Sequence, residues 1–306
     1  MAPLGRGPAR GQELNLHPNH SSSTPNKGPG FSRRVDGPDR RLERRPMLPS
    51  EILELFDRDQ RREVTHPAMR REAVGGVVRQ INEAGRSSTI IYSDLDPGGL
   101  DDAVQAQIAY FSRIGHELEW KVYTHDRPAD LRERLAAYGF TAGDPEALMV
   151  LDLEALPDKL HRRLRHPIRR ISEPDQLTDV LAVQTAVWED DYSWLIDELA
   201  AELRAAPESL SIYVADIAGV AGAVGWIRFD GRRAFASLWG GSTLQEQRGH
   251  GLYTDLLAVR AQEALQRGVR FLTIDAGPMS RPIVERLGFT VLSYSHACVW
   301  RPEPVG

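Results

Sequence analysis

The sequence contains a single cysteine and no long apolar run. The lone thiol, Cys298, cannot form an intramolecular disulfide, which agrees with a reducing compartment. No stretch is apolar for long enough to span a bilayer, and the N-terminus carries arginines and prolines without the apolar segment of a secretory signal. We therefore expect a cytoplasmic protein that makes no use of a membrane.

Positive charge is scarce outside the first 46 residues. The formal net charge is −5, but residues 1–46 hold nine Lys/Arg against four Asp/Glu, which leaves 29 against 39 for the remainder. Nucleic-acid binding needs clustered cations on the folded surface, so the acidic body makes such a partner unlikely in our interpretation. The basic segment could touch phosphates, although a solvated leader is the more ordinary interpretation of its composition.

The sequence also lacks a metal-binding spacing. His161 and His166 are five positions apart, which does not place them on one helical face, and no partner ligands lie near them in the sequence. We expect no metal.

Length and composition predict two compact units after a disordered tail. The chain has 306 residues, with 41% hydrophobic and 26% charged residues, which is typical of globular proteins of more than one domain. Residues 1–46 are rich in Gly, Pro, Ser and Arg and show no helical or strand periodicity, so we predict a disordered basic tail. The first folded unit is predicted at 50–156 and the second at 166–302.

Hydrophobic periodicity predicts an α/β (α+β) fold, in which each unit has a mixed sheet flanked by helices. In the first unit we predict helices at 49–62, 100–114 and 129–140, and strands at 75–81, 88–95, 117–126 and 146–153. In the second unit we predict helices at 173–188, 192–205, 251–267 and 280–289, and strands at 210–217, 222–229, 233–243, 270–276 and 290–300.

A glycine-rich loop, "RGHG" at 248–251, lies between a predicted strand and a predicted helix. Its amide N–H groups have neither a strand partner nor a helical acceptor, so they are available to an anion. Gly249 and Gly251 lack the Cβ atoms that would block a close approach, and the helix dipole adds a favourable potential. Arg248 adds a cation at the rim. The loop therefore predicts a phosphate or pyrophosphate site built mainly from backbone.

Two better-known phosphate loops do not match this segment. The sequence has no Gly-x4-Gly-Lys-Ser/Thr, which argues against a nucleoside triphosphatase, and no Gly-x-Gly-x-x-Gly, which argues against a dinucleotide fold.

The stretch "TLQEQRGHGLYTDLL" at 243–257, followed by "RFLTIDAGPMSRPIVERLGF" at 270–289, resembles the coenzyme site and C-terminal half of the GNAT acetyltransferase superfamily. The family pattern, Gln/Arg-x-x-Gly-x-Gly/Ala, falls on residues 248–253. The resemblance implies acetyl-CoA as the co-substrate, with its pyrophosphate on the loop amides and its pantetheine arm on the end of the preceding strand. The implied coenzyme-binding residues are Gly241, Ser242, Thr243, Arg248, Gly249, His250, Gly251, Leu252, Tyr253 and Thr254.

The resemblance covers about 170–300, and the first unit is similar only in its order of elements. It is therefore expected to be a degenerate GNAT-like domain without a coenzyme loop. The second unit departs from the family pattern as well. Tyr253 replaces the last Gly/Ala, so its ring should point out from the start of the helix, and Val284 stands where a tyrosine often protonates the departing thiolate.

The general base is not identified by the resemblance, because Ser237 aligns with the position that carries a glutamate in some relatives. An amine must lose its proton before it attacks a thioester, so a carboxylate near the acceptor is useful. The candidates are Glu189, Asp190 and Asp191, at the end of the first helix of the second unit, and Asp275, on the strand after the coenzyme helix; of these, Glu189 and Asp275 are the predicted catalytic residues. Trp188 and Trp239 are candidates for lining the acceptor cleft.

The sequence therefore predicts an N-acetyltransferase that moves an acetyl group from acetyl-CoA to an amine of a small molecule or peptide. The alternative is a catalytically inactive GNAT-fold protein that binds acyl-CoA as a sensor or scaffold, which the missing acid at Val284 and the missing glutamate at Ser237 would suit.

Overall fold

The computed structural model describes residues 45–302, except 68, 84, 86, 232 and 233. The predicted basic tail therefore lies almost wholly outside the described residues. Within them, no helix is long and apolar enough to cross a membrane.

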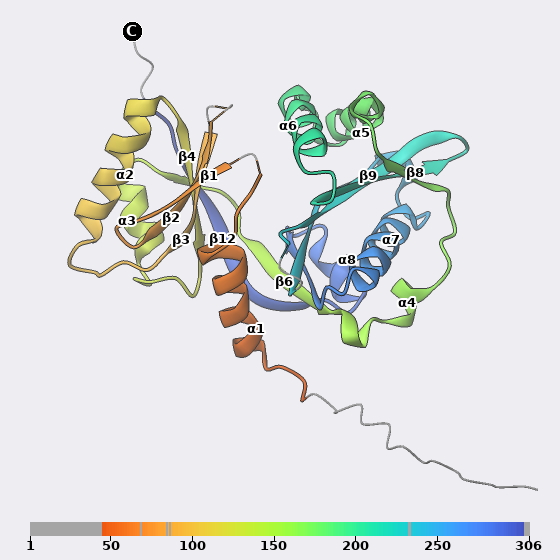
Figure 1. The fold of residues 1–306 in the computed structure, drawn as a ribbon, viewed down its shortest axis with the longest axis horizontal. Helices are drawn as coiled ribbons and strands as arrows, with labels where there is room; N and C mark the ends of the chain where they lie inside the picture. The colour runs from red at the N-terminus through yellow and green to blue at the C-terminus, as the bar shows by residue number, and fades with distance from the viewer. Residues whose placement is uncertain (1–44, 68, 84, 86, 232–233, 303–306) are drawn as a thin grey trace, which may run out of the picture. The chain divides into compact units, whose positions relative to one another are not determined.

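The first half of the described chain contains the predicted alternation of strands and helices (Figure 1). Its elements are α1 (Pro49–Phe56), η1 (Asp57–Arg62), β1 (Met69–Val74), β2 (Val77–Asn82), β3 (Ser87–Ser93), α2 (Leu100–Ile114), β4 (Glu117–Tyr123), α3 (Leu131–Ala137), β5 (Thr141–Ala142) and β6 (Glu146–Asp152). Strand β1 was missed in the sequence because its residues, "MRREAV", alternate poorly and it lies at the edge of the sheet. Gly75 and Gly76, predicted as the start of a strand, form the turn between β1 and β2 with positive φ angles of 55° and 82°.

The second half begins with short elements that connect it to β6: η2 (Leu153–Ala155), α4 (Asp158–His161) and β7 (Ile168–Ile171). The remaining elements are η3 (Pro174–Leu177), α5 (Thr178–Trp188), α6 (Ser193–Ala205), β8 (Leu210–Ile217), β9 (Val220–Phe229), β10 (Phe235–Thr243), η4 (Gln245–Gln247), α7 (Leu252–Gln266), β11 (Phe271–Ala276), α8 (Arg281–Glu285) and β12 (Thr290–Trp300).

All strands belong to one mixed sheet, in the order β1-β2-β3-β4-β12-β6-β11-β10-β9-β8-β7, with β5 beside β12. The mixed α/β fold flanked by helices is confirmed, but the two expected sheets are continuous. The 11-residue β12 joins them, because its first part pairs with β6 and its second part pairs with β4 (Figure 1). Strand β6, which the sequence analysis assigned to the first unit, also pairs with β11. The boundaries 50–156 and 166–302 stay a prediction.

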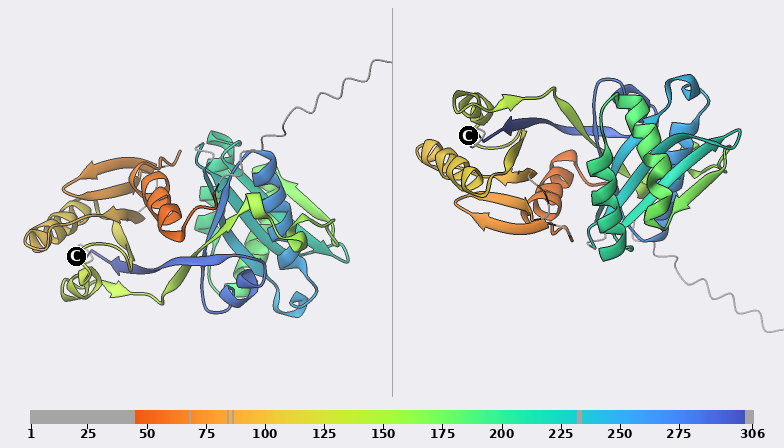
Figure 2. Two further views of the ribbon diagram at one scale, coloured as in Figure 1. Left: turned by 90° about the horizontal axis from the view of Figure 1, so that it is seen from below. Right: turned by 90° about the horizontal axis from the view of Figure 1, so that it is seen from above.

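Alternating side chains give the sheet of the second half two apolar faces. One face, with Ala223, Ile227 and Leu238, packs against Leu256 and its neighbours on α7. The opposite face, with Val224 and other strand residues, packs against α5 and α6 (Figure 2). Strands buried on both faces fix the ends of β10 and β11 in place, and those ends form the candidate site.

Candidate active site

Strands β10 and β11 run parallel for only part of their length. Their pairing ends at Leu238 and Ile274, whereas β10 continues to Thr243. The pairing of β10 with β9 has a register shift between Trp239 and Ser242. A β-bulge of this kind bends a strand and redirects its side chains. The end of β10 therefore leaves β11 and presents an edge that β11 does not occupy.

Glycine is required at the centre of this bulge. Gly240 has a φ of +61°, and a Cβ built on it would lie 1.8 Å from the indole ring of Trp226. Any larger residue would have to displace a buried tryptophan. Gln184 of α5 also fixes the bulge, because its Nε2 donates a 2.9 Å hydrogen bond to the Gly240 carbonyl.

Two glycines of the loop that follows β10 adopt a backbone conformation that favours glycine. Gly249 and Gly251 have φ angles of +82° and +94°, which other L-residues adopt only with strain. The Leu244 amide donates to Gly222, and the Gln247 amide donates to Leu244. Within the described residues, the six consecutive amides of 249–254 donate no hydrogen bond to the protein. They precede and begin α7, where the helix dipole favours an anion.

Both polar side chains of the loop lie at its rim. Arg248 is exposed, and its Nε donates to the Thr243 carbonyl over 3.3 Å, which places a cation beside the free amides. His250 is exposed, with Nδ1 3.3 Å from the Gln247 carbonyl oxygen. Neither side chain obstructs the loop amides.

A cleft of about 1790 Å³ extends from this loop along β10 and β11 to β4 and β6. Most of the predicted site residues line it: Trp188, Trp239, Gly241, Ser242, Thr243, Arg248, Gly249, Gly251, Leu252, Tyr253, Thr254 and Asp275. Glu189 and His250 are not among the lining residues. Glu189 is the exposed C-cap of α5, in the left-handed conformation with a φ of 55°.

The two predicted tryptophans lie on the walls of the cleft. Trp188 is 51% exposed, and its Nε1 donates to Ser242 Oγ over 3.0 Å. Trp239 is 43% exposed, its Nε1 donates to Ser237 Oγ over 2.7 Å, and the guanidinium of Arg228 lies 5.3 Å from its ring centroid. Large apolar surfaces held open in this way are typical of ligand-binding walls.

Tyr253 does not point out from the start of α7, as the sequence analysis expected. Its ring packs against the backbone of β10, where a Cβ built on Gly241 would lie 2.9 Å from its Cε2. Burial raises the pKa of the Tyr253 phenol, while the nearby Arg260 opposes that shift. The family pattern has a small residue at position 253. Here the larger ring of Tyr253 is accommodated because Gly241, on the facing strand, has no side chain.

Asp275 lies on the floor of the cleft and forms an ion pair that the sequence did not reveal. Its Oδ2 accepts a 2.5 Å bond from Nζ of Lys121 on β4, which is 154 residues away in the chain. Burial lowers the pKa of Lys121, but Asp275 and neighbouring groups outweigh it and raise the pKa overall. Oδ1 of Asp275 is buried and has no hydrogen-bond donor among the described residues.

Two further carboxyl groups on the cleft floor were also missed. Burial raises the pKa of Glu119 and of Glu146, against the opposing charge of Lys121. The signal in the sequence was the alternation of charged residues in "ELEWKVY", which brings Glu119 and Lys121 to one face of an otherwise apolar strand. Three carboxyl groups around one ammonium make this end of the cleft suitable for a cationic group.

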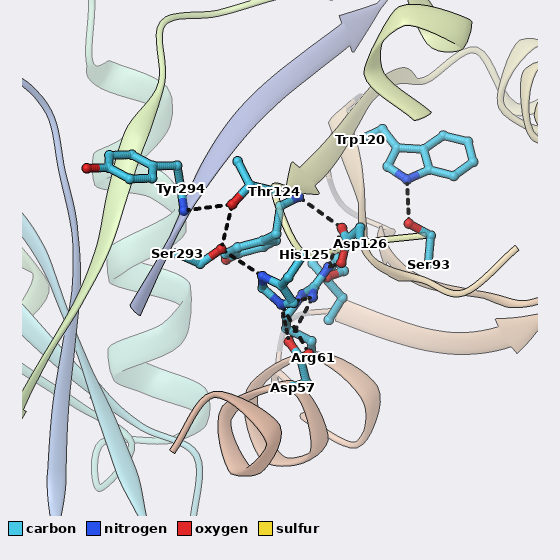
Figure 3. Close-up of polar contacts among 11 residues, drawn as sticks. Asp57, Arg61, Ser93, Trp120, Thr124, His125, Asp126, Ser293 and Tyr294 are labelled. Carbon is cyan, nitrogen blue, oxygen red and sulfur yellow. Dashed lines mark hydrogen bonds and ion pairs between the residues drawn. The ribbon is translucent and has the colours of Figure 1, made fainter. Parts of the chain in front are cut away.

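A second polar cluster connects η1 to the loop after β4 (Figure 3). Arg61 is 2% exposed and donates two 2.7 Å bonds to Asp126, while His125 contacts Asp57 over 3.1 Å and Ser293 over 2.7 Å. A serine, a histidine and a carboxylate that are connected by hydrogen bonds can form a nucleophilic triad. Ser293 is 6% exposed, and neither it nor His125 lines the cleft, so this cluster fastens β12 to η1.

Val284 cannot act as an acid, and the described residues hold no group of potential metal ligands. Val284 is fully buried in the core beneath α7, so it offers neither a proton nor a route to the cleft. In the described ranges, no three His, Cys, Asp or Glu side chains are grouped so that they could hold a metal ion.

Comparisons with known proteins agree with this geometry at the level of the fold. No family model matches the sequence, and no curated protein matches it. Among solved structures, a GCN5-related N-acetyltransferase from Kribbella flavida is 17% identical, with a TM-score of 0.58 over 84% of this chain and 95% of that one.

Two further solved structures have the same fold. A tandem GNAT protein from the clavulanic acid biosynthesis pathway is 17% identical, with a TM-score of 0.52 over 79% of this chain and 86% of that one. A GCN5-related N-acetyltransferase from Sphaerobacter thermophilus is 13% identical, with a TM-score of 0.53 over 75% and 78% of the two chains. The chain therefore has the fold of GNAT acetyltransferases.

Proposed function

We propose that this GNAT-fold chain is an N-acetyltransferase that transfers an acetyl group from acetyl-CoA to an amine of a small molecule or peptide. The observation that carries the proposal is the row of unpaired amides at 249–254, which faces a cleft large enough for a coenzyme and an acceptor. Backbone donors at a helix start suit a diphosphate, and acetyl-CoA carries one together with an activated acyl group.

The coenzyme-binding residues of the proposal follow the path of the cleft. Amides from Gly249 to Thr254 hold the pyrophosphate, and Arg248 adds a cation beside it. The edge of β10 from Gly241 to Thr243 binds the pantetheine arm, because β11 no longer occupies that edge. The thioester end is then directed toward the bulge at Trp239.

The acceptor occupies the remaining part of the cleft, between Trp188, Trp239 and the carboxyl groups of the floor. Holding the amine beside the thioester removes much of the entropic barrier to attack. Asp275, whose side chain is partly exposed and lines the cleft, accepts the proton of the amine, while Lys121 holds its Oδ2. Glu189 is the weaker candidate for this role, because it lies on an exposed helix end outside the cleft lining.

The domain assignment and the location belong to the same proposal. Residues 166–302 carry the coenzyme loop, and residues 50–156 act as a degenerate partner domain that supplies Lys121, Glu119 and Glu146 to the shared cleft. A cytoplasmic location is supported by the lone cysteine, Cys298, which is free and buried, in keeping with a reducing compartment.

Purified full-length protein tests the proposal in two steps. Calorimetric titration with acetyl-CoA should show saturable binding at one site per chain, and a panel of amines should then release free thiol in proportion to acetylated product. Binding without turnover on any amine would favour the sensor or scaffold. Absence of coenzyme binding would overturn the site itself.

A further inference from the structure

Arg260, in the middle of α7, is a buried cation without a partner carboxylate. The residue is 1% exposed. Its Nε donates to the Leu256 carbonyl over 2.9 Å, and its Nη1 donates to the carbonyls of Trp226 and Trp239 over 3.1 and 3.3 Å. Within the part of the chain that the structure describes, Nη2 has no hydrogen-bond acceptor and the guanidinium forms no ion pair.

A comparison with Arg61 shows how unusual this environment is. Arg61 is buried to the same degree, but two aspartates, Asp57 and Asp126, neutralise it. Burial lowers the pKa of Arg260 to about 10, and the phenols of Tyr253 and Tyr213 oppose that shift. Three carbonyls accept hydrogen bonds from Arg260, but they do not neutralise its charge and they leave Nη2 without an acceptor among the described residues, so an anion from outside the chain would complete the site.

The missing side chain of Gly225 leaves space for the Arg260 guanidinium. A Cβ built on Gly225 of β9 would lie 2.9 Å from Nη1 and 3.1 Å from Nη2, so the glycine leaves room for the group. Through the Trp239 carbonyl, Arg260 contacts the bulge at which β10 leaves β11. Arg260 itself lines the cleft, together with Gly240 and Gly241.

We propose that Arg260 stabilises the coenzyme A thiolate as it leaves, in place of the acid that is absent at Val284. The inference rests on the proposed function, since it takes the pantetheine arm to lie along Gly241 to Thr243 and its sulfur to reach the bulge. When the amine attacks and the C–S bond breaks, the electron pair stays on sulfur, next to a fixed positive charge. The proton of the amine goes to Asp275, and the released thiolate takes a proton from water.

This role predicts a property of the bound product that can be measured without turnover. A guanidinium near the sulfur favours the thiolate, so the pKa of the coenzyme A thiol should fall on binding. The other titratable or charged groups around the site include Tyr253, Tyr213, the Lys121–Asp275 pair, Glu119, Glu146 and Arg228, and they are identical in all the variants compared. A tenfold preference for the thiolate would lower the pKa of the thiol by about one unit.

Wild-type protein alone provides the first test. The affinities of coenzyme A and desulfo-coenzyme A are compared from neutral to alkaline pH. We expect the ratio of the two affinities to favour coenzyme A increasingly as the thiol ionises, reaching at least about tenfold. The ultraviolet absorbance of the bound thiolate should also appear at a lower pH than that of free coenzyme A. A ratio that is independent of pH would overturn the inference while leaving the coenzyme site intact. Failure of both ligands to bind would instead overturn the proposed function.

Variants separate the charge of Arg260 from its support of the bulge. Arg260→Gln should return the pKa of the bound thiol to that of free coenzyme A and lower kcat more than it changes KM. Arg260→Lys keeps the charge but cannot hold both carbonyls, so it should retain most of the lowered thiol pKa. Equal losses of the thiol shift in the two variants would assign Arg260 a structural role only.

Discussion

Two segments of the chain have the same local topology and opposite chemistry. In each, a strand is followed by a loop, a 15-residue helix and a parallel strand: β3–α2–β4 in the first half and β10–α7–β11 in the second. In each, the parallel pairing covers four residue pairs and ends before the first strand does. The backbone alone therefore allows an opening between the strands at both places.

The difference lies in what the sequence puts at each opening. In the first segment, the fully buried Trp120 of β4 donates from Nε1 to Ser93 Oγ at the end of β3 and so bridges the two strands (Figure 3). The loop there carries Asp94 and Asp96, and the first turn of α2 carries Asp101 and Asp102. These carboxylates occupy the favourable end of the helix dipole and repel a phosphate.

In the second segment, no side chain of the described residues bridges β10 and β11 as Trp120 and Ser93 bridge β4 and β3. The acidic residue in the first turn of α7 is Asp255, which is fully buried and turned toward Arg162 and His166 of the connecting segment. The proposed coenzyme site therefore needs more than a strand–loop–helix unit. It needs glycine-built amides, a clear opening, and acidic groups directed elsewhere.

The largest expected effect is on coenzyme binding. Gly251→Asp adds a carboxylate in front of the loop amides, where the nearest atoms to the new Cβ are His166 Cε1 at 3.9 Å and Arg165 Nη1 at 4.0 Å. Repulsion of the diphosphate should cost about 4 kcal/mol at about 4 Å, which is about a thousandfold in affinity by calorimetric titration.

Gly115→Asp is the matched control for this substitution. Gly115 also has a positive φ, +70°, with open space around it, but it ends α2 far from the loop in sequence. Its variant should bind acetyl-CoA as the wild type does. Unchanged affinity in Gly251→Asp, with the circular dichroism spectrum preserved, would contradict the site.

The next effect is on stability alone. Trp120→Ala removes a fully buried indole from the core between α2 and the sheet, and replacements of this kind cost about 3–5 kcal/mol. Urea unfolding should show that loss, while acetyl-CoA affinity of the folded variant should stay within about twofold of wild type. Trp188→Ala, at an exposed tryptophan, should show the reverse pattern. A large loss of affinity in Trp120→Ala would mean that the two segments do not function separately.

The sequence was sufficient for those parts of the molecule that depend on local geometry. The strand–loop–helix unit around the glycines at 249 and 251 follows from spacing and residue type. Contacts between strands and side chains that are far apart in the sequence could not be predicted from these local patterns. The apolar run of β6 predicts a central strand but not its neighbours, Lys121 and Asp275 are distant in the chain, and Arg260 in a helix of mixed composition looks like a surface residue.

A smaller effect, with a pH dependence, is expected from Asp255→Asn. Burial disfavours the charged form, but hydrogen bonds from His166 and Arg165 and the charge of Arg162 prevail, so the pKa of Asp255 is lowered. The stabilisation is therefore present above the unfolded pKa of about 3.9 and is lost as the pH falls through the folded pKa. Near neutral pH the variant should lose about 2–3 kcal/mol in urea unfolding, and the two curves should converge toward acid pH. A difference that is independent of pH would contradict this account, and Asp190→Asn on the exposed end after α5 is the control.

The smallest effect tests whether charge alone separates the two segments. The double substitution Asp101→Asn and Asp102→Asn removes the acidic groups from the first turn of α2, where Asp101 pairs with Arg134 on the surface. Stability should change little, because exposed ion pairs contribute little. Calorimetry with acetyl-CoA should still give one site per chain, and the binding should disappear when Gly251→Asp is added. A second site in the double variant would mean that the aspartates, rather than Trp120 and the loop before α2, whose Gly98 and Gly99 lack the positive φ angles of Gly249 and Gly251, keep the coenzyme from the first segment. An unchanged stoichiometry would assign the difference to backbone shape, which only glycines at the required positions of the loop provide.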